Sequence, residues 1–150
     1  MCGIRITYPR GRGIDDMPFE IGKAVEVRLG AKEALMPQTI FKGEITTVEP
    51  EFGAGGVSVL IRAYDRGHRL HRTRSSRTFA NQTSSDIVEK LCDEQGLQSI
   101  IVASGEPHEH LHQENETDWD FIWRLAERVG FEVVIDDETA YFGPPDQEAA

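Results

Sequence analysis

The sequence predicts an α+β fold that combines small barrel-like antiparallel β-hairpins with two amphipathic helices. Three observations carry this prediction. Short β-prone segments separated by glycine and proline fill the first half of the chain. Two stretches with helical apolar spacing and capping residues lie in the second half, and another β-prone pair follows them. A chain of 150 residues buries roughly 68–70% of its unfolded surface, so this fold requires neither metal nor disulfides.

The first half reads as strands. Residues 1–20 carry several glycines and prolines and little apolar periodicity, so we expect a loop or flexible start. Residues 24–29 alternate between apolar and charged side chains, as a half-buried strand does. Residues 39–48 and 57–64 are also β-prone and are separated by a glycine-rich stretch. We therefore predict a β-hairpin with a long tip over these two segments.

The first helix is expected over Asp86–Glu94. Ser84 or Ser85 is its expected N-cap, and Gly96 ends it. Its apolar residues share one helical face, which predicts a short amphipathic helix packed on the core. These residues are Ile87, Val88, Leu91 and Cys92.

The second expected helix has clearer signals at both ends than the first. Thr117 is the expected N-cap, Asp118 and Asp120 favour the positive end of the helix dipole, and Gly130 ends the helix. Asp120 and Arg124 have the spacing of an ion pair. The apolar stripe is wide enough to pack on two sides, against the chain's own sheet and against another element or subunit. It comprises Trp119, Phe121, Ile122, Trp123, Leu125, Ala126 and Val129. A second hairpin is expected over residues 131–142.

Charge and cysteine content exclude several classes of protein. The formal charge is −10, from 16 basic and 26 acidic residues, which argues against nucleic acid as a partner. No apolar run is long enough to span a bilayer. Two cysteines cannot form a disulfide framework. Arginines crowd residues 62–77, and acidic residues dominate 106–138, a segregation typical of contacts between subunits or between parts of one subunit.

Three constellations could carry chemistry. His108, His110 and His112 alternate, so on one strand they would face the same way and could bind a metal ion. The acidic pairs occupy a first helical turn and a hairpin tip, where aspartate is expected for local backbone reasons. The glycine-rich loops lack the surroundings of a phosphate-binding motif. We expect no catalytic residues, no metal and no cofactor.

Three blocks of the sequence resemble the phage late control protein D family, which is close to the VgrG spike proteins. These blocks are YDRGHRLHR at Tyr64–Arg72, SDIVEKL at Ser85–Leu91, and QENETDWDFIWRLAERVGFE at Gln113–Glu132. They occur in the family's order, and the likeness runs from about Pro18 to Pro145. Members of the family have more sequence on both sides, so the resemblance implies a partial chain that lacks the spike.

The resemblance also implies a division and an assembly. In that family, two related barrel-like domains associate as a trimer into a ring beneath the tail tube, and a spike follows. Mapped here, 1–17 is a flexible start and 18–77 is part of the first domain. Residues 78–112 form a connecting helix and strand, and 113–150 is part of the second domain.

We therefore expect a structural baseplate hub component of a contractile phage tail or a phage-derived injection system. It would be a homotrimer that joins the tail tube to the spike, assembled in the bacterial cytoplasm and mature in the baseplate. The alternatives are a small protein-binding adaptor or effector-loading module, and a metal-dependent hydrolase built on the histidines. The candidate subunit contacts are Arg62, Arg66, Arg69, Arg72, Arg74, Arg77, Trp119 and Trp123.

Overall fold

The computed structural model describes residues 1–8, 18–30, 36–53 and 56–145. The chain forms two compact units, Met1–Asp65 and Arg66–Ala150. The first unit is a β-sheet in the described residues, and the second combines helices with two small sheets, so the predicted α+β class is confirmed. In the described residues, no helix combines the length and apolar character needed to cross a bilayer.

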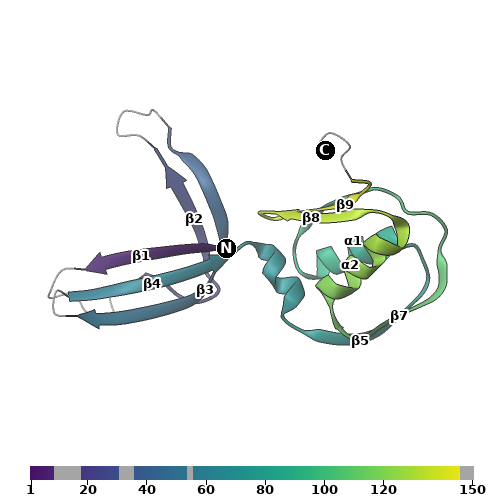
Figure 1. Cartoon of the computed structure of the whole chain (residues 1–150), viewed down its shortest axis with the longest axis horizontal. Coiled ribbons are helices and arrows are strands. Elements are labelled where there is room, and N and C mark those ends of the chain that lie inside the picture. Colours follow the sequence, from purple (N-terminus) through teal and green to yellow (C-terminus); the bar gives the residue numbers. More distant parts are fainter. Residues whose placement is uncertain (9–17, 31–35, 54–55, 146–150) are drawn as a thin grey trace. The chain divides into compact units, whose positions relative to one another are not determined.

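The first unit contains four antiparallel strands in the order β1-β4-β3-β2 (Figure 1). The predicted hairpin is confirmed, because β3 and β4 pair from Glu44↔Tyr64 to Gly53↔Gly56. Pro50 lies within β3 and does not interrupt it. The described sheet is open, with β1 and β2 at its edges, and it does not close into a barrel. The strands are β1 Cys2–Tyr8, β2 Ala24–Leu29, β3 Gln38–Gly53 and β4 Gly56–Tyr64.

The strand β1 corrects the expectation of a loop at the start of the chain. Cys2, Ile4, Ile6 and Tyr8 are half-buried, and the residues between them are exposed. This is the two-residue period of a strand that packs one face on a core. Prolines and glycines further along obscured this short alternation. The other residues of the expected flexible start, 9–17, lie outside the described part of the chain.

The core of the first unit is small. Ile45, Val59 and Ile61 are its buried cluster, and half-buried side chains such as Val25 and Val48 pack against it. The long strand β3 pairs with two neighbours: its first part pairs with β2 and its second part with β4. A register shift after Ile45 marks the change of partner, as a β-bulge does where a strand bends.

Gly43 lies on β3 where the chain passes closest to the end of β4. A Cβ atom at this position would collide with the carbonyl group of Tyr64 and come within 2.8 Å of the Phe41 ring. The clash involves backbone, which cannot rotate away as a flexible side chain would. The β3–β4 pair therefore requires glycine here.

Gly43→Ala is expected to destabilise the β3–β4 pair by about 1–3 kcal/mol, the cost of forcing atoms into a packed site. Amide hydrogen exchange along β4 would then speed up by about tenfold or more. Gly3→Ala on β1 is the matched control, because nothing lies within 4 Å of its added Cβ. Equal exchange rates in the two variants would contradict the assigned close approach.

The second unit places both helices between two small sheets (Figure 1). The helix α1 contacts β6 and β9 on one side and β5 on the other, while α2 contacts β8 and β7. The second helix therefore packs on two sides within this unit. Its elements are the 3-10 helix η2 Arg66–His71, β5 Arg74–Gln82, α1 Ser84–Glu94, β6 Gln98–Ile101, β7 His108–Thr117, α2 Asp118–Val129, β8 Glu132–Asp136 and β9 Thr139–Gly143.

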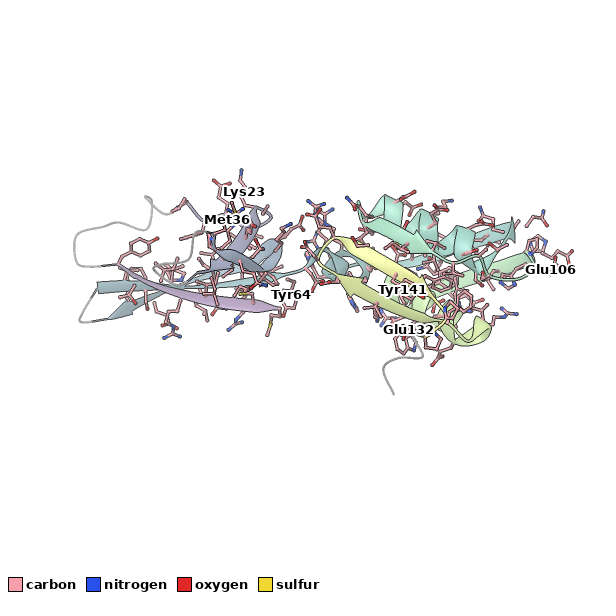
Figure 2. All side chains as sticks on the ribbon, turned by 90° about the horizontal axis from the view of Figure 1, so that it is seen from above. Lys23, Met36, Tyr64, Glu106, Glu132 and Tyr141 are labelled. Carbon is pink, nitrogen blue, oxygen red and sulfur yellow. The ribbon has the colours of Figure 1, made fainter. Side chains whose placement is uncertain are left out.

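The second predicted hairpin is confirmed as β8 and β9, which pair from Glu132↔Gly143 to Asp136↔Thr139. Figure 2 labels Glu132 and Tyr141 on these neighbouring strands. The strand β6 joins β9 in parallel, a pairing that the sequence did not predict. A parallel pair needs a crossover between its strands, which is why a search for hairpins misses it.

Both helices follow the predicted boundaries closely. In α2, the Thr117 side chain accepts a hydrogen bond from the Asp120 amide at 3.1 Å, and Gly130 adopts φ +72° at the other end. In α1, the N-cap is Thr83 and not Ser84 or Ser85, because Thr83 and Asp86 form a reciprocal capping box.

The apolar face predicted for α1 is buried, including Cys92. Burial raises the pKa of the Cys92 thiol to about 12, with a smaller contribution from the charge of Asp93, so this thiol stays protonated at neutral pH. Cys92 is therefore a core residue, as its place in the sequence predicted.

The compact units divide the chain at a different point from the expected domains. Residues 66–77 were assigned to the first domain but lie in the second unit. Leu70 is buried in the second core, and Arg74 on β5 pairs with Thr117 on β7. These long-range contacts hold the segment in the second unit, and its sequence carries no mark of them.

Candidate assembly surface

The candidate arginines do not form one exposed patch. Arg62 belongs to the first unit, where its guanidinium lies 3.3 Å from the Glu49 carboxylate. The others belong to the second unit, and each contacts a group of that unit. Their partners include Glu138 for Arg66, the Gln95 carbonyl for Arg69, His68 for Arg72, the Asn115 carbonyl for Arg74, and Glu94 with Asp118 for Arg77.

Arg77 is the centre of a polar network beneath the helices. It donates to the Glu94 carboxylate at 2.6 Å, to the Gln113 side-chain carbonyl at 3.0 Å and to the Asp118 carboxylate. Gln113, which is fully buried, donates to Asp118 at 2.9 Å, and Gln95 donates to its other oxygen at 3.3 Å. Burial opposes the charge on Arg77, but the hydrogen bonds to Glu94 and Asp118 outweigh it and raise the pKa of the guanidinium.

The two candidate tryptophans occupy different environments on α2. Trp119 is half-buried and packs against the core, and its ring centroid lies 5.1 Å from that of His71. Trp123 is 48% exposed, with its ring centroid 6.2 Å from that of Trp119. Its indole N–H donates to the Glu127 carboxylate at 3.2 Å. The wide apolar stripe therefore leaves Trp123 at the surface.

Arg124 takes a different partner from the one expected. Its guanidinium donates to the Glu116 carboxylate at 2.5 Å and to the His112 carbonyl at 2.8 Å, and it lies 4.9 Å from the centre of the Phe121 ring. Asp120, the predicted partner one turn away, is exposed beside it. The strand β7 lies against α2 and offers Arg124 a less exposed carboxylate.

The three histidines lie on β7, as predicted, but they do not converge. The His108 ring lies 2.9 Å from the Ser84 hydroxyl, and the His112 ring lies 3.0 Å from the Thr78 hydroxyl. His110 and His112 line an open depression with Glu114, Glu116 and Arg124. Within the described residues, no three histidine, cysteine or acidic side chains are arranged to hold a metal ion.

Four of the exposed apolar side chains of the first unit escape prediction from the sequence. They lie on β2, on β3 and just before β2, and each is more than half exposed. Leu29 shared a predicted face with Val25 and Val27, yet only the two valines are half-buried. The period of a strand indicates which side chains share a face, not whether anything covers that face. These exposed residues are Ile21, Leu29, Ile40 and Phe52.

Comparison with known proteins identifies the family. Residues 15–150 match the model of the Alg8 N-terminal domain. The chain belongs to this family. No curated protein sequence matches the chain.

Solved structures with this fold include phage tail proteins. The 43 kDa tail protein of prophage MuSo2 from Shewanella oneidensis has a TM-score of 0.74 and 19% identity, over 94% of this chain and 42% of its own. The tail protein from Neisseria meningitidis MC58 has a TM-score of 0.57 and 19% identity, over 75% and 36% of the two chains. At these identities, the likeness shows that this chain shares their fold.

The E. coli c3393 protein, a component of the type VI secretion system, is also similar. Its TM-score is 0.59 and its identity 26%, over 82% of this chain and 37% of its own. That protein is structurally similar to the T4 bacteriophage tail proteins gp27 and gp5. The chain thus spans 36–42% of the length of these three structures.

Proposed function

We propose that this chain is a structural part of a baseplate hub that joins the tail tube to the spike, in a contractile phage tail or a phage-derived injection system. The observation that carries the proposal is the TM-score of 0.74 to a phage tail protein over 94% of the chain. The similarity to a type VI secretion component supports the same class of machine. The sequence blocks that resemble the late control protein D and VgrG families favour the hub in particular.

The distribution of polar groups supports a structural role over catalysis. The polar side chains that lie deepest in the second unit, Gln113 and Asp118, bond to one another and to Arg77. Groups satisfied in this way stabilise a fold and are not available to a substrate. The depression around His110 is open, whereas small-molecule sites are concave and enclose their ligand.

The proposed assembly is a homotrimer that contacts tail tube and spike proteins. Exposed apolar side chains on the first unit and the tryptophans on α2 are surfaces that such contacts would cover. Because each candidate arginine contacts a group of its own unit, we assign the arginines to the stability of the units and retain Trp119 and Trp123 as the stronger assembly contacts.

Sedimentation and binding measurements test this function. The purified chain is expected to associate towards a trimer as its concentration rises, and to bind the tail tube protein of the same particle. Ile40→Lys, which adds charge to an exposed apolar residue of β3, should weaken the association. Glu89→Lys on the exposed face of α1 is the control. A chain that stays monomeric at high concentration and does not bind the tube protein would not be a hub component.

A further inference from the structure

One strip of α2 combines aromatic and acidic side chains at the surface. We call Trp119, Asp120, Trp123 and Glu127 the α2 strip. Trp119, Trp123 and Glu127 follow one another at four-residue intervals, and Asp120 lies three positions before Trp123, spacings that place side chains next to each other on a helix. Asp120 and Glu127 are exposed, and Trp123 is exposed across about half its surface. The His71 ring contacts Trp119, with centroids 5.1 Å apart.

The chemistry of the α2 strip selects a cationic partner. The face of an indole ring attracts a cation, and a guanidinium stacks on it better than an ammonium does because it is planar and weakly hydrated. The Glu127 carboxylate lies 3.2 Å from the Trp123 indole nitrogen, so a cation stacked on this ring would lie close to a negative charge. An arginine side chain satisfies both features, whereas an apolar partner would leave the carboxylates without a counter-charge.

Several arginines of the second unit already form ion pairs within that unit, so they are poor candidates for that partner. Arg66, Arg77 and Arg124 each pair with a carboxylate of their own unit. Residues 66–150 contain eight basic and seventeen acidic residues, a formal charge of −9. A second copy, with a formal charge of −10 over the whole chain, would therefore bring net negative charge to an acidic strip. This charge balance favours a different, basic protein.

We propose that the α2 strip binds an arginine-bearing basic segment of another protein of the assembly. Trp123 stacks on the guanidinium, Asp120 and Glu127 supply the counter-charge, and Trp119 with His71 supports the Trp123 ring from the core side. This inference deepens the proposed function, on which it rests for the existence of an assembly.

The test uses the full chain and three capped peptides. In each peptide, glycine alternates three times with one other residue, which is arginine, lysine or citrulline. The probe is the indole N–H resonance of Trp123, followed by NMR as peptide is added. We expect this resonance to shift with the arginine peptide, to shift less with the lysine peptide, and not to shift with the citrulline peptide, which keeps the shape and lacks the charge. A citrulline peptide that binds as well as the arginine peptide would overturn the inference.

Matched variants separate the strip from the overall negative charge. The double variant Asp120→Asn with Glu127→Gln is expected to raise the Kd for the arginine peptide by about tenfold or more. The control is Asp93→Asn with Glu89→Gln on the exposed face of α1. It removes the same number of negative charges and should change the Kd less than about twofold. Equal losses in the two double variants would mean diffuse attraction and would overturn the proposal.

Sedimentation distinguishes a second copy from a different protein. If Trp123→Glu dissociates an oligomer that the chain forms alone, a second copy covers the strip and the inference is wrong. If the oligomer survives this change while peptide binding is lost, the inference is supported. The peptide measurement needs no tube protein, so it tests the inference separately from the proposed function. If the chain binds the peptide at the strip but neither associates nor binds the tube protein, only the proposed function is contradicted.

Discussion

Replacing Phe121 by alanine is expected to lower the free energy of unfolding of the second unit by about 3–5 kcal/mol. The Phe121 side chain has 0% exposure and lies on the side of α2 that faces the core. Its ring stacks on Phe79 of β5 with centroids 5.5 Å apart, so its loss leaves a cavity between a helix and a sheet. Domains of this size are stable by about 5–15 kcal/mol, which makes this a large fraction of the total.

Substitutions of two arginines on the same helix serve as comparisons for this loss of unfolding free energy. Arg124→Ala should cost about 1 kcal/mol, because it removes a partly exposed ion pair with Glu116 and a cation–π contact with Phe121. Arg128→Ala, at an exposed position, should stay within about 0.5 kcal/mol. Denaturant unfolding followed by the helical circular dichroism signal gives all three values. A cost for Arg128→Ala close to that of Phe121→Ala would show that the helix register is wrong.

The helices were predictable because their signals are local. Thr117, Gly130 and the apolar residues between them lie within fourteen positions of the chain, and each acts on a neighbour one turn away. The hairpins were predictable for a similar reason, since their strands adjoin in sequence. Even the error at the first cap was small, because Thr83 precedes the serines that we preferred.

What escaped prediction depends on distant parts of the chain. The sequence shows that Arg77 and Asp118 are charged, but not that β5 and α2 bring them together over 41 positions. A charge-segregated sequence is equally compatible with contacts within one subunit and between subunits, and the structure places Arg66 and Arg77 in the first class. The sequence also could not predict the exposure of Trp123, because a wide apolar stripe does not indicate which of its edges the core leaves uncovered.

Removing the cation at the centre of the polar network is expected to have the second largest effect. Arg77→Leu should destabilise the second unit by about 3 kcal/mol, the lower end of the cost of breaking a buried ion pair. The Asp118 side chain is only 8% exposed, and without Arg77 its remaining side-chain partners would be the neutral donors Gln113 and Gln95. The Arg77 side chain is 29% exposed, which places the estimate at the lower end.

A thermodynamic cycle separates the pair from the packing of the arginine stem. Adding Asp118→Asn to Arg77→Leu should recover about 1–2 kcal/mol of the loss, because the second change removes the buried charge that the first left unpaired. Glu94→Gln removes the more exposed partner of Arg77 and should cost less than about 1 kcal/mol. Additive losses in the double variant would mean that Arg77 acts through its stem and not through its charge. Recovery of stability in the double variant would instead identify the contact between β5 and α2 as an ion pair in which neither partner can be removed alone without a large cost. Such a pair explains why this arginine lies inside the unit and is not presented to a partner.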